Sequence, residues 1–215
     1  CLIILGIILT FAVSKILGQT ILKGIPSSFT LELPPYRRPA VKQVIVRSLF
    51  DRTAFVLSRA AMAAAPAGII IWALANLQVH DISLLNHLTA ILDPFAYYLG
   101  LDGVILTSFI LGFPANETVI PIMLMAYLSQ NTLIEIQELS QLKDLLVANG
   151  WTWLTALCTM LFSLNHFPCA TTCLTIHHET KSWRWTILAW ALPTVTGLAI
   201  CAVTAYIARL FWSWL

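Results

Sequence analysis

Long hydrophobic runs separated by short polar segments make up most of the chain. Because a helix that crosses a bilayer needs about 20 mostly apolar residues, five runs are predicted to span a membrane: 1–22, 53–77, 103–129, 151–176 and 185–211. A sixth run, 82–101, has the length but carries an amide, an imidazole, a carboxylate and a proline, so it could span, re-enter or lie along the surface. The pattern therefore predicts an all-α, polytopic membrane helix bundle with five to six spans.

Composition excludes a soluble domain. The 215 residues are 59% hydrophobic and 10% charged, with a mean hydropathy of +0.83, whereas soluble domains carry about 25% charged residues. The eight tryptophans agree with this, because Trp concentrates at the boundary between membrane and water. We expect membrane lipid to surround the chain, and so much membrane argues against nucleic acid as a partner.

The distribution of charge predicts which loops lie inside the cell. Basic residues dominate the segment between the first two spans: Lys23, Arg37, Arg38, Lys42, Arg47, Arg52 and Arg59. Because basic loops stay in the cytoplasm, this segment is predicted to be cytoplasmic, with an amphipathic surface helix within 41–59. Residues 130–150 are acidic instead, fit the outer side if 82–101 spans, and predict a short amphipathic helix that ends at Gly150.

Two of the predicted spans are interrupted by a proline with polar neighbours, in "FPANE" (113–117) and "NHFPCATT" (165–172). Proline removes a helical hydrogen bond and frees backbone groups, which lipid cannot satisfy. Such breaks therefore persist inside protein or beside a water-filled cavity, and in transporters paired broken helices often build the substrate site. We predict that the two breaks lie at similar membrane depth and face each other.

The residues at the breaks resemble a cation site. Glu117 is the strongest candidate, because carboxylates within membranes are usually functional. His166 alone could be a packing residue or a ligand, and Cys169 and Cys173 alone could be structural. Thiolate, imidazole and carboxylate together suit Fe(II), Mn(II), Co(II) or Zn(II). The predicted metal-ligating residues are Asn116, Glu117, His166, Cys169 and Cys173.

Other motifs narrow the class of protein. The five cysteines lie in apolar segments, so disulfides are not expected. No GxxxxGK[ST], HExxH or GxSxG motif occurs, which argues against a phosphate-binding loop or a hydrolase in these residues. The adjacent His177 and His178 are interpreted as part of an interfacial turn. Because the chain begins at Cys1 inside an apolar run, we expect it to be the C-terminal part of a longer protein.

Four motifs resemble the C-terminal membrane half of the FeoB family of bacterial ferrous iron transporters. They are "FTLELPPYRRP" (29–39), "GFPANETVIPIMLMAYL" (112–128), "NGWTWLTALCTMLFSLNHFPCATTCLTI" (149–176) and "PTVTGLAIC" (193–201). The resemblance implies the end of a core module at 1–50, a second Gate module at 53–205 and a tail at 206–215. It aligns Cys169 with the Gate cysteine proposed to line the iron path, and Glu117 with the Gate glutamate.

The same resemblance implies a location and partners. It places the chain in the bacterial inner membrane, with a GTP-binding domain and a first Gate upstream. It is also compatible with a homo-oligomer. Fe²⁺ would be the transported substrate, and GTP bound to the upstream domain would gate its path. The resemblance implies no permanently bound cofactor and no enzymatic activity in this chain. Two alternatives remain: a nucleoside or small-solute transport module, and a membrane metal or redox sensor or scaffold without transport.

Overall fold

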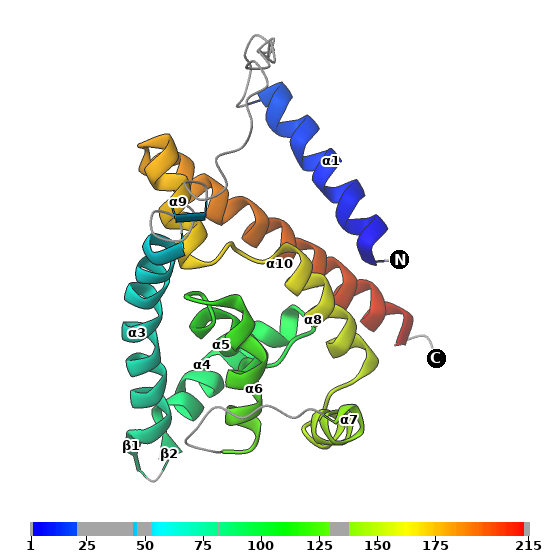
Figure 1. Cartoon of the computed structure of the whole chain (residues 1–215). Coiled ribbons are helices and arrows are strands. Elements are labelled where there is room, and N and C mark those ends of the chain that lie inside the picture. The colour runs from blue at the N-terminus through cyan, green and yellow to red at the C-terminus, as the bar shows by residue number, and fades with distance from the viewer. Residues whose placement is uncertain (1, 21–44, 47–52, 81, 130–137, 213–215) are drawn as a thin grey trace, which may run out of the picture. The chain divides into compact units, whose positions relative to one another are not determined.

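The computed structural model describes residues 2–20, 45–46, 53–80, 82–129 and 138–212. Within them the chain is almost entirely helical, as predicted (Figure 1). The elements are α1 (Leu2–Thr20), α3 (Phe55–Asn76), β1 (Gln78–Val79), β2 (Ile82–Ser83), α4 (Leu84–Tyr98), α5 (Gly103–Leu111), the 3₁₀ turn η2 (Asn116–Thr118), α6 (Val119–Tyr127), α7 (Leu139–Ala148), α8 (Trp153–Asn165), α9 (Ala170–Thr180) and α10 (Trp183–Trp212). The prediction for residues 29–39 and most of that for 41–59 lie outside the described residues.

The chain divides into two units, residues 1–57 and 58–215. In the first, α1 is apolar throughout and long enough to cross a membrane over Ile3–Thr20. The second holds the remaining helices and both of the predicted breaks. Strands β1 and β2 pair antiparallel there and form only a tight connection between α3 and α4.

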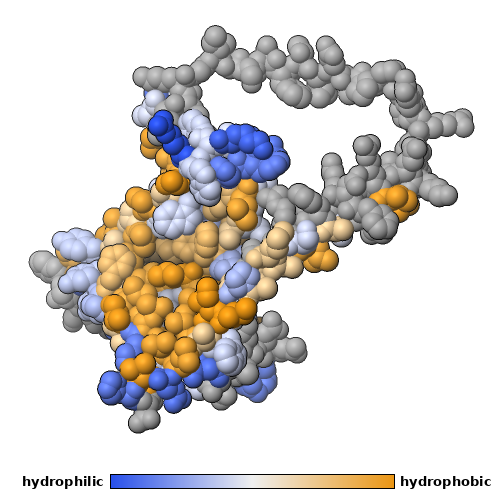
Figure 2. Space-filling view, turned by 90° about the vertical axis from the view of Figure 1, so that its left-hand side faces the viewer, coloured by the Kyte–Doolittle hydropathy of each residue, from blue (hydrophilic) through white to orange (hydrophobic). Residues whose placement is uncertain are grey.

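Two described helices, α1 and α10, are individually long and apolar enough to span a membrane. Two further pairs qualify only when taken together: α4 with α5, bent by 110°, and α7 with the α8–α9 segment, bent by 113°. The described residues therefore hold two candidate spans, or four if each bent pair counts as one. Hydrophobic residues form a band between hydrophilic ends on the face shown in Figure 2, as expected for a surface in contact with lipid.

Helices α5 and α6 form the most buried part of the second unit. Ile105 and Ile122 are both 0% exposed, and Phe109 of α5 meets Phe162 of α8 edge to face with ring centroids 4.8 Å apart. Helix α4 packs on α5, while α10 packs along α8 and α9. The predicted amphipathic helix before Gly150 is α7, and Gly150 has the left-handed φ of +85° typical of a residue that ends a helix.

The bend between α4 and α5 is closed by side chains. Asp102 accepts a hydrogen bond from the Ile105 N–H at 2.7 Å, and Asp93 accepts one from the Gly103 N–H at 2.8 Å. The Tyr127 hydroxyl donates to the second oxygen of Asp102 and accepts from Trp151 Nε1 at 2.7 Å. Asp93, Asp102, Tyr127 and Trp151 are called the Asp102 network below. Its carboxylates accept hydrogen bonds from N–H groups at the start of α5, which have no partner within the helix.

Candidate metal site at two helix breaks

The first break separates α5 from α6. Helix α5 ends at Leu111, and the chain continues through Pro114 to the 3₁₀ turn η2 and then α6. At Gly112 a Cβ would lie 2.4 Å from Val119 Cγ2, so only glycine allows the chain to fold back this closely. Pro121 falls in the first turn of α6, where a missing N–H costs nothing.

The second break separates α8 from α9. Helix α8 ends at Asn165, His166 is extended with ψ 172°, and Cys169 is the N-cap of α9 with ψ 162°. Because the helix is interrupted between them, His166 and Cys169 do not share one continuous helix face. Helix α10 approaches this break closely, because a Cβ on Gly197 would lie 2.9 Å from the Asn165 carbonyl oxygen.

The two breaks meet. The Ala170 N–H, in the first turn of α9, donates a 2.9 Å hydrogen bond to the Phe113 carbonyl in the other break. The rings of Phe113 and Phe167 pack edge to face with centroids 5.6 Å apart, and Phe167 stacks on Trp190 of α10 at 6.0 Å. One free donor of α9 is therefore satisfied by a carbonyl that the first break exposes.

Two buried polar atoms beside these contacts have no hydrogen-bond partner among the described residues: Asn116 Oδ1 and His166 Nε2. His166 Nδ1 lies 2.8 Å from the Ser163 carbonyl, and because a carbonyl can only accept, Nδ1 carries the proton. In the neutral ring Nε2 is then a bare lone pair. An unpartnered buried polar group costs about 1–3 kcal/mol, so a ligand that used both atoms would recover that energy.

The two thiols lie one helical turn apart. Cys169 Sγ lies 3.1 Å from the hydroxyl oxygens of both Thr171 and Thr172. Cys173 Sγ donates only a long, 3.6 Å hydrogen bond to the Pro168 carbonyl. The sulfur of Cys169 is therefore positioned by the two hydroxyls, and a thiolate is a soft ligand for a metal ion.

Glu117 lies on η2 and is exposed. Its side chain forms no ion pair or hydrogen bond with another described residue. The described residues contain no group of three or more His, Cys, Asp or Glu side chains arranged to hold a metal ion. The predicted ligands therefore do not form a preassembled cage, although the segments that carry them are joined at Phe113 and Ala170.

Sequence reasoning missed several groups at this site. The Phe113 carbonyl is a backbone atom, so no side-chain pattern could have pointed to it. The hydroxyl contacts of Thr171 and Thr172 with Cys169 Sγ were not predicted either, because an N-cap side chain usually bonds the backbone N–H groups of those two positions and not their hydroxyls. His177, assigned to an interfacial turn, has a buried ring nitrogen, Nδ1, without a partner.

Comparison with known proteins gives the family. Residues 48–183 match the model of the Gate family, described as nucleoside recognition, and residues 1–51 match the model of the ferrous iron transport protein B C terminus. Over 98% of its length the chain is 30% identical to the Fe(2+) transporter FeoB of Staphylococcus aureus (strain COL), and it covers 31% of that relative. The chain belongs to the FeoB family.

Other FeoB relatives agree. Fe(2+) transporter FeoB of a Synechocystis strain is 29% identical over 91% of this chain, and that of Methanocaldococcus jannaschii is 24% identical over 96%; the chain covers 31% of each. It thus spans about a third of the length of the curated relatives it matches. No solved structure matches it. The family and the apolar helices make it a multi-pass protein of the bacterial inner membrane.

Proposed function

We propose that this chain forms part of the path by which a FeoB protein moves Fe²⁺ across the membrane, with the ion bound transiently where the two breaks meet. The observation that carries the proposal is the hydrogen bond from the Ala170 N–H to the Phe113 carbonyl. It joins two interrupted helices, and each break carries a buried acceptor atom without a partner among the described residues, Asn116 Oδ1 and His166 Nε2; transporters build substrate sites from such paired broken helices.

Each proposed ligand suits ferrous iron in a different way. Cys169 supplies a soft sulfur, His166 supplies the Nε2 lone pair, and Asn116 supplies a neutral oxygen. Conduction requires binding that is strong enough to admit the ion and weak enough to release it. A set of ligands that is not closed into a cage in the described residues meets that requirement better than a structural metal site would.

Glu117 and Cys173 complete the proposed set. Glu117 contributes negative charge to a dication that has lost part of its water, which reduces the cost of bringing the ion into a medium of low dielectric. Cys173, one turn beyond Cys169 on α9, offers the next sulfur along the helix.

The resemblance also suggests how the chain is organised. We propose a core-module end at 1–50, a second Gate at 53–205 and a tail at 206–215, crossing the membrane five to six times with the two breaks as Gate-type broken helices. A GTP-binding domain and a first Gate in the rest of the protein would gate the path. In this arrangement the chain itself catalyses no reaction, and Fe²⁺ is substrate, not a resident cofactor.

A second candidate function is nucleoside transport, since the Gate family model is described as nucleoside recognition. In that case amides and aromatic rings would bind the solute, and the thiol of Cys169 would be dispensable. The buried amide oxygen of Asn116 suits either substrate. The two functions therefore differ in whether the Cys169 thiol is needed and in which solute is transported.

Reconstitution tests the proposal. The complete protein in proteoliposomes should take up Fe²⁺ when supplied with GTP and should not take up a labelled nucleoside. Glu117→Gln keeps size and hydrogen bonding but removes the charge, and we expect it to lower the rate of Fe²⁺ uptake more than Asp144→Asn, a change at an exposed carboxylate on α7. Nucleoside uptake, or Glu117→Gln transport at the wild-type rate, would contradict the proposal.

A further inference from the structure

We infer that His177 is a further Fe²⁺ ligand, which extends the path from the breaks along α9 to the C-terminal end of that helix. The inference rests on the proposed function and adds a residue to it. It replaces the interpretation of His177 as part of a plain interfacial turn.

Three soft donors recur at a spacing of four residues. Cys169 is the N-cap of α9, and Cys173 and His177 follow it on an uninterrupted helix, Ala170–Thr180. Residues four apart lie one above the other on a helix face. The thiol at the break, the second thiol and the imidazole therefore form a row along one side of α9.

The spacing favours successive ligands over one common site. The first and last residues of the row, Cys169 and His177, are eight residues apart, a rise of about 12 Å, whereas metal–sulfur and metal–nitrogen bonds are about 2.0–2.3 Å long. One ion cannot bind closely to all three side chains of the row. This agrees with the absence of a preassembled three-ligand group in the described residues, and it suits an ion that passes from one ligand to the next.

The packing of His177 leaves a ring nitrogen unused. Its ring stacks on Trp183 of α10, with centroids 4.1 Å apart and planes at 29°. The stacking holds the ring by contact with its flat face and does not use the ring nitrogens. Nδ1 is buried without a hydrogen-bond partner among the described residues. A histidine that served only as a packing residue would be expected to satisfy this atom, because leaving it unpaired is costly.

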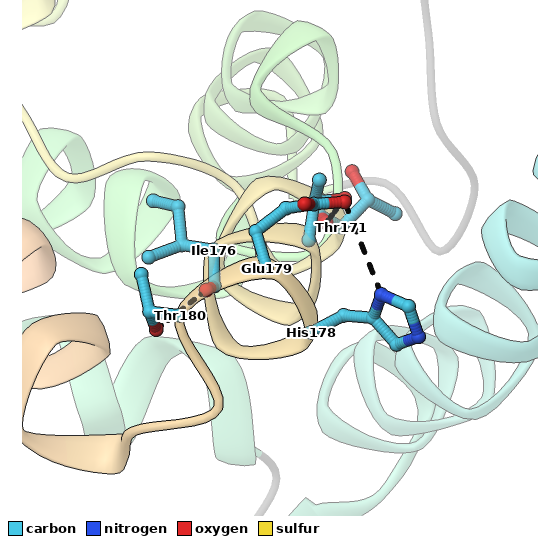
Figure 3. Close-up of polar contacts among 6 residues, drawn as sticks. Thr171, Ile176, His178, Glu179 and Thr180 are labelled. Atoms are coloured by element: carbon cyan, nitrogen blue, oxygen red, sulfur yellow. Dashed lines mark hydrogen bonds and ion pairs between the residues drawn. The ribbon is translucent and has the colours of Figure 1, made fainter.

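The end of α9 is also favourable for a cation. The side chains of His178 and Glu179 approach to 3.9 Å and are 67% and 77% exposed. Figure 3 marks this contact with a dashed line beside the last turn of α9. The carbonyl end of a helix carries partial negative charge. The exposed carboxylate and the helix end together would raise the concentration of Fe²⁺ next to His177.

Two substitutions with opposite effects on packing and ligation test the inference. His177→Phe keeps a ring to stack on Trp183 but has no donor atom, whereas His177→Cys loses the stack but keeps a soft donor. A ligand role predicts that His177→Phe lowers Fe²⁺ uptake about tenfold, the low end of the loss seen when a group supporting a bound metal is removed, and that His177→Cys restores part of the rate. A packing role predicts the reverse order.

The control is His178→Phe, a change to the exposed neighbour outside the row, which should transport at the wild-type rate. Uptake is measured in proteoliposomes of the complete protein and normalised to inserted protein; His177→Asn, which keeps a polar atom near the position of Nδ1, replaces either variant that does not insert. His177→Phe transport equal to wild type, or better than His177→Cys, overturns the inference. Wild-type protein that moves no Fe²⁺ would instead refute the proposed function itself.

Discussion

The helices α5, after the α4–α5 bend, and α9, after the α8–α9 break, satisfy the free N–H groups of their N-termini in different ways. At α5 the Asp102 network gives the free N–H groups carboxylate acceptors, and Tyr127 and Trp151 extend it. At α9 the N-cap Cys169 makes no side-chain cap bond, and among the described residues Asn116 Oδ1 in the α5–α6 break and His166 Nε2 in the α8–α9 break have no hydrogen-bond partner. The α4–α5 bend is closed by protein groups, whereas at the α8–α9 break, here called the open break, we propose that the free atoms bind the ion.

The largest loss of stability should come from adding a side chain at the tightly packed α4–α5 bend. A Cβ on Gly103 would lie 2.1 Å from the Thr89 carbonyl oxygen and 3.0 Å from Asp93. Because backbone cannot move aside cheaply, Gly103→Ala should destabilise the protein by about 3 kcal/mol, measured by unfolding in detergent. Gly68→Ala on α3, where a Cβ meets nothing within 4 Å, is the control and should be neutral or stabilising. Equal stability of the two variants would show that the bend is not tightly packed.

The Asp102 network should give the next largest effect. Tyr127→Phe removes the donor to Asp102 and the acceptor of Trp151 Nε1. Two buried partners are left unsatisfied, so we expect a loss of about 2 kcal/mol with unchanged Fe²⁺ uptake per folded molecule. Tyr206→Phe, at a side chain 69% exposed on α10, should change neither quantity. A Tyr127→Phe protein of wild-type stability would mean that the network does not hold the bend.

The smallest change in stability, and one of opposite sign, is expected where the two breaks meet, at Asn116 in the α5–α6 break. Asn116→Leu is close in size and removes the unpartnered Oδ1, so it should stabilise the protein by about 1 kcal/mol while it lowers Fe²⁺ uptake. Asn149→Leu, an amide that bonds the Leu145 carbonyl at the end of α7, should instead lower stability slightly and leave uptake alone. A destabilised Asn116→Leu variant with normal uptake would reverse the contrast between the two regions.

Part of this contrast could be predicted from the sequence. A proline among polar residues inside an apolar run indicated both breaks, at Pro114 and Pro168, and an amphipathic pattern before Gly150 indicated α7. These features are local, since they depend on backbone chemistry and on helix periodicity. The candidate ligands could also be picked out from the sequence, because carboxylates and imidazoles are rare within membranes.

The remaining features depend on contacts between distant segments. Asp93 and Asp102 could not be told from candidate cation ligands until their partners, Gly103, Ile105 and Tyr127, were known. The bond between Phe113 and Ala170 joins residues far apart in sequence. His177 was assigned to a plain turn because its stacking on Trp183 and its unpartnered nitrogen arise only when α9 and α10 pack.

The most direct test of the central claim compares two cysteines. Cys169 lies at the open break, while Cys158 is 0% exposed on α8. In the complete protein, Cys169→Ser should lower the rate of Fe²⁺ uptake into proteoliposomes and weaken the preference for Fe²⁺ over Mn²⁺, because serine keeps the size but loses the soft sulfur. Cys158→Ala should transport at the wild-type rate per folded molecule. Equal uptake and equal preference in both variants would contradict the claim that the open break binds the ion.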